Sequence, residues 1–147
     1  MKLIRKQIDP TEEEAVILEY IEWTSEWENL SDYIEGKKRQ IIGYGTKKEM
    51  YSIQLEDILY FEAVGDLVFA YTGDQVYEIK MRLYQVEDIV QQNGILRASK
   101  SFLVNVRKIE KVRSVLNGRF MAVMENGEEV LITRHYAREV MDAIKSV

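Results

Sequence analysis

Cysteine is absent from this sequence of 147 residues, and histidine occurs only once, at His135. Without cysteine the chain can form neither a disulfide nor a thiolate nucleophile, and the common zinc sites are reduced to carboxylate-only versions. We therefore expect no metal and no other cofactor. A Ser-His-Asp triad would have to use His135, but this residue falls in a predicted helix among polar neighbours, which is typical of a surface or packing residue. The sequence predicts a protein that is not an enzyme, has no catalytic residue and takes no small-molecule substrate.

Long apolar runs are also missing. The sequence contains no stretch of about 18 apolar residues, and its first residues lack the apolar block of a signal peptide. Neither export nor membrane insertion is indicated, so we expect a cytoplasmic protein. The 46% hydrophobic and 31% charged residues are typical of a soluble globular protein with a sizeable core.

Charge is distributed unevenly within a net charge of -5. Residues 1–36 hold three lysine or arginine residues against ten acidic ones, whereas residues 37–147 hold 17 against 15. We therefore expect a small acidic N-terminal unit over residues 1–36 and a main domain over residues 37–147. From Gly94 onwards ten cations face six acids. Such a local excess is compatible with DNA binding, because the field near a site matters more than the total charge.

The N-terminal unit is predicted to contain two strands and a helix. Loose alternation over residues 2–8 predicts a short strand, and residues 15–21 are expected to form a second strand, although a helix is possible there. Ser25 and Glu28 match a capping box, in which the two residues satisfy each other's exposed backbone amides at a helix start. Gly36 suits the end of that helix.

The main domain shows β-forming segments that are separated by turns every eight or nine residues, a pattern that favours antiparallel strands. Asn117-Gly118 and Asn126-Gly127 predict two type I′ hairpin turns and hence a three-stranded meander. The expected strands span residues 41–44, 50–53, 58–64, 67–72, 75–80, 109–116, 119–124 and 128–132.

Helices are expected in two places in this domain. Apolar residues at helical spacing predict one helix over residues 83–90, and Thr133 is expected to cap a final helix. The apolar stripe of the final helix is Tyr136, Val140, Ile144 and Val147. The predicted fold class is mainly β, a β-rich α+β fold of antiparallel sheets with short helices.

A run of hydrogen-bond donors stands directly before an apolar block. Residues 97–101 offer a guanidinium, an amine and two hydroxyls, and residues 102–104 are consecutive apolar residues. In a strand, consecutive apolar side chains face both sides of the sheet, which suits a buried strand. Such a strand would hold the polar loop in place, and the loop carries groups that contact phosphates and base edges. An ordinary surface turn is the alternative for this stretch alone.

Arg134 falls in the first turn of the final helix, where a cation opposes the helix dipole. Local stability therefore does not account for it. Free amides at a helix start bind phosphate, and an arginine placed there can reach a guanine edge. The alternative is an exposed arginine without a partner.

The order of these segments resembles the LytTR DNA-binding domain of bacterial response regulators over residues 40–147. The resemblance rests on residues 55–63, the helix from Leu83, Arg97, residues 100–105, residues 117–119, residues 125–128 and residues 133–136. The family implies an elongated fold of antiparallel sheets whose loops enter successive major grooves of double-stranded DNA.

The resemblance also implies which residues contact DNA. The base-contacting positions of the family match Asp66, Lys100 and Arg134. Asp66 is acidic and would repel phosphates, so Lys47 and Lys48 are the alternative source of a contact with the DNA backbone. Further residues are expected to contact the backbone or to support the loops, namely Arg97, Ser99, Ser101, Asn105, Lys111, Arg113 and Arg138.

Partners follow from the resemblance as well. Residues 1–36 are too short for the phosphoacceptor domain that precedes this module in many relatives, so the chain looks like the stand-alone form. Members of that form regulate transcription without phosphorylation and are often paired with a small membrane protein. We expect a homodimer on repeated DNA half-sites, with the acidic unit contacting a second copy or such a membrane protein. The alternative is a β-rich protein- or carbohydrate-interaction module without DNA binding, which would also explain the aromatic residues and the acidity.

Overall fold

The computed structural model describes residues 1–36 and 39–146. The chain divides into two compact units, Met1–Glu35 and Gly36–Val147. Lys37, where the predicted main domain begins, and Val147, the last predicted stripe residue, lie outside the described residues. Among the described residues, no helix has both the length and the apolar composition to span a membrane.

The first unit contains one helix, α1 (Ser25–Ile34), and no strand. The strands predicted over residues 2–8 and 15–21 are therefore wrong, and residues 15–21 form no helix either. A strand needs a neighbouring strand to satisfy its backbone groups, and neither segment has one. Their apolar side chains stay in solvent: Leu3 is 76% exposed and Ile17 is 82% exposed.

The helix predicted in this unit is confirmed, but its capping box is wrong. Thr24 occupies the N-cap position, and its side chain makes no capping hydrogen bond. Ser25 is already the first helical residue, which places its hydroxyl one position too late for a capping box. The carboxylate of Glu28 instead accepts a hydrogen bond of 2.6 Å from the indole of Trp23.

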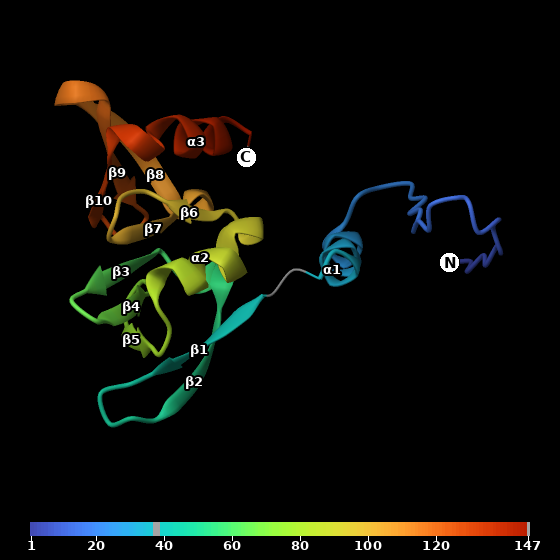
Figure 1. Ribbon diagram of the computed structural model, residues 1–147, viewed down its shortest axis with the longest axis horizontal. Helices are drawn as coiled ribbons and strands as arrows, with labels where there is room; N and C mark the ends of the chain where they lie inside the picture. The colour runs from blue at the N-terminus through green and yellow to red at the C-terminus, as the bar shows by residue number, and fades with distance from the viewer. Residues whose placement is uncertain (37–38, 147) are drawn as a thin grey trace. The chain divides into compact units, whose positions relative to one another are not determined.

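The second unit is built mainly of antiparallel strands in two sheets, so the predicted fold class is confirmed. The larger sheet has the order β2-β1-β5-β4-β3-β7-β6. Its strands are β1 (Gln40–Tyr44), β2 (Met50–Gln54), β3 (Tyr60–Val64), β4 (Leu67–Tyr71), β5 (Val76–Ile79), β6 (Ile95–Arg97) and β7 (Phe102–Asn105). The helix α2 (Leu83–Val90) packs beside this sheet, and α3 (Arg134–Lys145) packs beside the smaller one (Figure 1). Short 3₁₀ turns connect these elements: η1 (Leu55–Asp57), η2 (Gln91–Asn93), η3 (Val106–Lys108) and η4 (Leu116–Gly118).

The smaller sheet is the predicted three-stranded meander, formed by β8 (Ile109–Val115), β9 (Arg119–Met124) and β10 (Glu129–Ile132). Its first turn has φ of +65° at Asn117 and +71° at Gly118, as a type I′ turn requires. The second turn is not of this type, because only Gly127 has a positive φ. The N–H of Gly127 donates to Met124 at 2.9 Å, and the N–H of Met124 donates to Glu128 at 2.8 Å. This longer loop ends on a left-handed glycine, so the type I′ prediction for residues 126–127 is wrong.

The strand β7 lies between two apolar cores. Leu103 belongs to the core that α2 covers, together with Phe61 and Val86. Val104 faces the other way, into the core that the smaller sheet and α3 cover, together with Val140. Both faces of β7 are therefore buried, which explains its consecutive apolar residues and confirms the predicted buried strand.

A pair of tyrosines joins the two sheets. The rings of Tyr60 and Tyr71 stack with their centres 4.4 Å apart. The hydroxyl of Tyr60 donates to Glu128 next to β10, and that of Tyr71 donates to Glu62 at 2.8 Å. Burial and these carboxylates raise the pKa of both phenols, that of Tyr71 to about 12. Both hydroxyls therefore remain donors at neutral pH. Since the ring of Phe102 lies 5.9 Å from that of Tyr60, this pair supports the start of β7.

Candidate functional site

The polar loop between β6 and β7, residues 98–101, is held by its carbonyl groups. The carbonyl oxygen of Lys100 accepts a hydrogen bond of 2.8 Å from the guanidinium of Arg97. The carbonyl oxygen of Ser101 accepts one of 2.8 Å from the N–H of Ala63 on β3. These acceptors are used within the domain, whereas the side chains of Lys100 and Ser101 are exposed. The loop therefore presents donors to solvent from a fixed backbone, and its polar and apolar parts lie as predicted.

The start of α3 is attached to the same loop. Thr133 donates to the carbonyl oxygen of Ala98 from its N–H at 2.9 Å and from its hydroxyl at 3.3 Å. Thr133 is the N-cap residue, as predicted, but its hydroxyl does not cap the helix because it is used on Ala98. Among the residues that the structure describes, no side chain caps the first backbone amides of α3. Such free amides favour an anion at this end of the helix.

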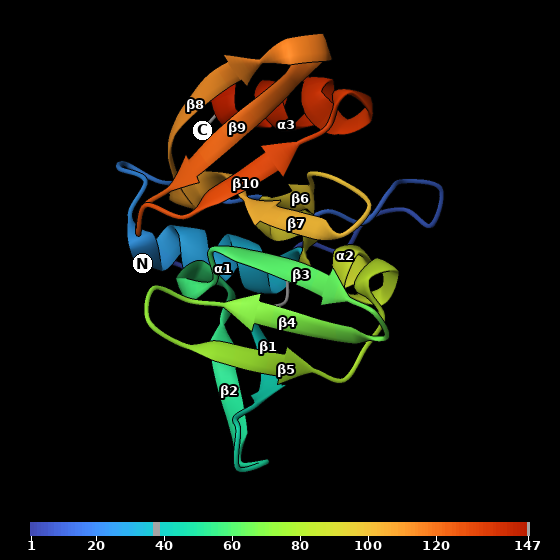
Figure 2. The same ribbon diagram turned by 90° about the vertical axis from the view of Figure 1, so that its left-hand side faces the viewer.

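Arg134 is exposed and extends over the β8–β9 turn. A Cβ atom built on Gly118 would lie 3.3 Å from Cγ and 3.4 Å from Cδ of Arg134. The arginine stem can take this course because Gly118 has no side chain. The start of α3, the β6–β7 loop and the β3–β4 turn follow one another down one side of the domain (Figure 2).

A hollow of about 540 Å³ lies between the loop and the helix start. It is lined by Ser99, Lys100, Ser101, Thr133, His135 and Tyr136. The ring of His135 makes an edge contact with that of Tyr136 at 4.7 Å, so the single histidine belongs to this surface. The lining consists of hydroxyls, one amine and two rings, without a carboxylate.

The β3–β4 turn, which carries Asp66, adjoins the loop through the bond between Ala63 and Ser101. The carboxylate of Asp66 forms an exposed ion pair with Arg82, with Nη1 and Oδ1 3.3 Å apart. Arg82 thus brings a cation to a turn where the sequence shows only an acid. Sequence reasoning missed Arg82 because nothing in the chain order links it to Asp66, 16 residues earlier.

The other predicted cations lie on separate parts of the domain. Lys47 and Lys48 form the β1–β2 turn, which lies across β5, β4 and β3 from the loop strands. Lys111 and Arg113 lie on β8, where Arg113 makes an ion pair of 3.0 Å with Glu129. Arg138 is exposed on α3 one turn after Arg134. Of these residues, Arg138 alone lies on the helix whose start is attached to the Lys100 loop.

Two predicted supporting residues make contacts within the domain. Asn105 is 2% exposed, and its amide donates to the carbonyl oxygen of Ile58 at 2.8 Å. Its side-chain oxygen accepts a bond of 3.2 Å from the N–H of Arg107. The hydroxyl of Ser99 accepts a bond of 3.4 Å from the N–H of Ser101. Asn105 therefore faces backbone groups at the end of β7 remote from the loop.

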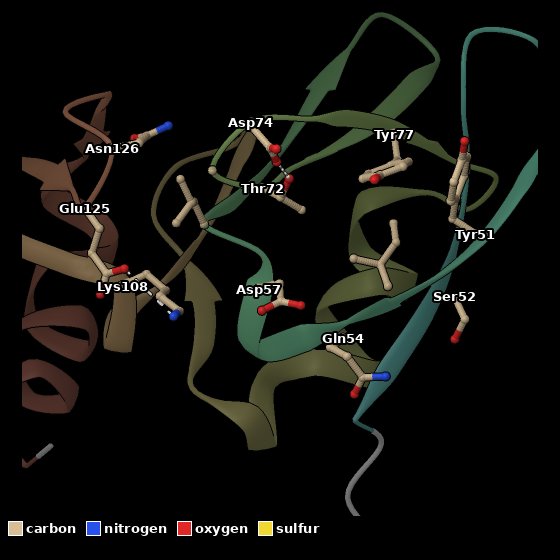
Figure 3. A pocket seen from close by; sticks show the side chains of 13 residues that line it. Tyr51, Ser52, Gln54, Asp57, Thr72, Asp74, Tyr77, Lys108, Glu125 and Asn126 are labelled. Atoms are coloured by element: carbon tan, nitrogen blue, oxygen red, sulfur yellow. Dashed lines mark hydrogen bonds and ion pairs between the residues drawn. The ribbon is translucent and has the colours of Figure 1, made fainter.

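A second hollow of about 540 Å³ lies between β2, the β4–β5 turn and the β9–β10 turn (Figure 3). Its lining includes the carboxylates of Asp57, Asp74 and Glu125 against one cation, Lys108. That lysine is already paired with Glu125 at 3.8 Å. The acidic lining repels phosphates, so this hollow does not suit a polyanion. Within the described ranges, no group of three histidine, cysteine, aspartate or glutamate side chains could hold a metal ion.

Comparisons with known proteins agree with this arrangement. A family model described as the LytTr DNA-binding domain matches residues 48–145. An uncharacterized HTH-type transcriptional regulator of Staphylococcus aureus strain NCTC 8325 is 30% identical over 108 residues, which cover 74% of this chain and 72% of that protein. Its counterpart in strain MRSA252 is 29% identical over 108 residues, with the same coverage of both chains. A solved LytTr DNA-binding domain from Bacillus cereus has the same fold, with a TM-score of 0.67 and 21% sequence identity over 73% of this chain and 97% of that domain.

Proposed function

We propose, since the chain belongs to the LytTR DNA-binding domain family, that it regulates transcription by inserting its β6–β7 loop and the start of α3 into the major groove of double-stranded DNA. The resemblance predicted from the sequence is confirmed by the family match. DNA binding is the activity of this family, and its relatives in Staphylococcus aureus are named as transcriptional regulators. The chain would act in the cytoplasm and without catalysis.

The observation that carries this proposal is the attachment of α3 to the loop through Thr133 and Ala98. It brings together an exposed amine at Lys100, an exposed guanidinium at Arg134 and the uncapped amides of a helix start. Cations and free amides bind phosphates, and lysine or arginine donates to the O6 and N7 atoms of guanine. The arrangement thus suits both the DNA backbone and base edges.

We divide the contacts into two groups. Lys100 and Arg134 read base edges, and Asp66 acts through Arg82, the cation that it holds at the neighbouring turn. The remaining predicted residues contact phosphates or support the loops: Arg97, Ser99, Ser101, Asn105, Lys47, Lys48, Lys111, Arg113 and Arg138. Contacts with phosphates supply affinity that depends on salt, whereas base contacts supply specificity.

Fluorescence anisotropy with DNA from the chain's own upstream region tests the function. We expect saturable binding at low salt that weakens linearly with the logarithm of the salt concentration. Absence of binding to this DNA and to fragments selected from random sequence would show the function to be wrong. The alternative of a protein- or carbohydrate-interaction module predicts instead a ligand whose binding depends little on salt and is unchanged in Lys100→Ala.

The N-terminal unit is proposed to contact a second copy of the chain, so that the dimer occupies repeated half-sites. All residues of α1 are at least partly exposed, including Leu30, Tyr33 and Ile34. A unit of this size buries too little apolar surface to be stable alone and gains from association. Sedimentation of the full chain and of a shortened chain that begins at Lys37 tests this: a dimer that becomes a monomer supports it, and two monomers refute it. If both are monomers, a small membrane protein is the partner to test next.

Gly118→Ala is expected to weaken DNA binding as well as the fold. The positive φ of +71° makes alanine unfavourable there by about 1 kcal/mol, and the new methyl group would press on the stem of Arg134. Gly127→Ala is the matched control, because its φ is +89° and no atom lies within 4 Å of the new methyl group. We expect both variants to lose a similar unfolding free energy in urea, and only Gly118→Ala to bind DNA more weakly. Equal DNA affinity in the two variants would refute the contact.

A further inference from the structure

The guanidinium of Arg97 connects the β6–β7 loop to α2. One side of it bonds Glu87, with Nη2 at 2.9 Å and Nε at 3.3 Å from the same carboxylate oxygen. The remaining nitrogen, Nη1, donates to the carbonyl oxygen of Lys100 at 2.8 Å. All three nitrogens are thus used inside the domain, and the arginine forms a bridge from a helix to the loop.

The bridge is largely withdrawn from solvent. The side chain of Arg97 is 14% exposed and that of Glu87 is 29% exposed. Charge-assisted bonds are stronger and less screened in such surroundings than on an open surface. An arginine in this position is poorly placed to reach a phosphate, although it is the first cation of the donor-rich loop sequence.

Glu87 is itself held by a rigid element. The neighbouring helix residues Leu83, Val86 and Val90 are buried in the core under the larger sheet. This packing fixes α2, and the carboxylate projects from its flank towards Arg97. The same helix is preceded by Arg82, whose partner Asp66 lies on the adjacent β3–β4 turn. That second pair is exposed, so the bond to Arg97 is the firmer of the two.

We propose that Glu87 is a positioning residue for DNA recognition, which holds Arg97 so that the Lys100 carbonyl points into the domain and the Lys100 amine points out. This inference rests on the function proposed above. Glu87 touches no DNA and bears the wrong charge to do so. Its role is to keep the backbone of the β6–β7 loop in one conformation before DNA binds. A loop that is already ordered favours the correct DNA sequence over others.

Glu87→Ala, with Asp88→Ala as its control, tests the proposal. Both substitutions remove one negative charge from α2, and the structure gives the exposed Asp88 no bonded partner among the described residues. We expect Glu87→Ala to lose about tenfold in the ratio of specific to non-specific DNA affinity, a difference of about 1.4 kcal/mol. Asp88→Ala should leave this ratio unchanged. Glu87→Gln keeps the shape of the side chain, and its affinity ratio is expected to lie between those of Glu87→Ala and Asp88→Ala. This variant keeps the proposal testable if Glu87→Ala fails to fold.

Arg97→Lys separates positioning from direct contact with phosphate. Lysine keeps the positive charge, but its single ammonium lacks the planar fork with which separate nitrogens of Arg97 bond Glu87 and the Lys100 carbonyl. Positioning predicts that Arg97→Lys loses specificity as Glu87→Ala does, with an unchanged salt slope. If Arg97 contacted a phosphate, Arg97→Lys would retain the specificity ratio, and the proposal would be wrong.

Hydrogen exchange of the amides of residues 98–101 in the free protein gives a readout that needs no DNA. We expect faster exchange in Glu87→Ala and Glu87→Gln but not in Asp88→Ala. If the unaltered chain binds DNA, but both Glu87 variants keep the exchange rates and the specificity ratio of that chain, the proposed role of Glu87 is wrong. A failure of the unaltered chain to bind DNA would instead overturn the proposed function, and the exchange rates would still decide whether the bridge orders the loop.

Discussion

Lys100→Ala is expected to weaken binding to a specific DNA site by about 1–3 kcal/mol and to relax the preference at one base pair. The amine of Lys100 is exposed, and the backbone beneath it is held by the bonds of its own carbonyl and of the Ser101 carbonyl. Removing the side chain therefore removes a donor and leaves the loop in place. Anisotropy titrations at one salt concentration, on the selected site and on variants of each base pair, measure both effects.

Arg134→Ala should weaken binding to the specific DNA site by the same amount as Lys100→Ala. The base pair at which the preference relaxes should differ, because Lys100 and Arg134 lie on separate elements. Arg138→Ala is the matched control: it removes the same charge one helical turn further along α3. We expect Arg138→Ala to weaken binding to all sequences alike and to lower the salt slope by about 1. All three residues are exposed, so the unfolding free energy should change little. If Arg134→Ala and Arg138→Ala had the same effect on every DNA sequence, Arg134 would not read a base.

The β6–β7 loop could be predicted from sequence because its support is local. Consecutive apolar residues in Phe102, Leu103 and Val104 require a strand that is covered on both faces, and the structure has apolar cores on both sides of β7. The Asn117-Gly118 turn could be predicted equally well, since its two positive φ angles restrict the residue types that can occupy it. In both cases the physical requirement lies within a few residues of the chain.

The contacts that position the loop could not be predicted in this way. The bridge from Glu87 through Arg97 and the pair of Asp66 with Arg82 join charges that lie on different elements, and any other pairing of these charges would fit the sequence equally well. The prediction of two strands in the N-terminal unit is wrong for a related reason. Alternation over residues 2–8 indicates a strand only if a partner strand exists, and the structure provides none.

Asn105→Ala is expected to destabilise the domain by about 3 kcal/mol, the largest stability effect among these substitutions. The amide of Asn105 donates to Ile58, just before β3, and its oxygen accepts from the N–H of Arg107 in η3. Alanine would leave the buried carbonyl oxygen of Ile58 without this partner, and the part-buried N–H of Arg107 would lose its bond as well. A buried group that loses its bond costs about 1–3 kcal/mol, and here the same side chain also serves the part-buried N–H of Arg107.

Asn126→Ala is the control for this prediction, because the side chain of Asn126 also accepts from a backbone N–H, that of Glu128 at 3.0 Å, but in an exposed turn. Water can replace that bond, so a loss below about 1 kcal/mol is expected in urea unfolding. Similar losses of unfolding free energy in the two variants would show that burial does not determine how much Asn105 contributes to stability. A larger loss in Asn105→Ala with unchanged specificity for DNA would place its role at the junction of β7, β3 and η3. The loop that carries Lys100 is held at the other end of β7, by the bonds of Arg97 to the Lys100 carbonyl and of Ala63 to the Ser101 carbonyl.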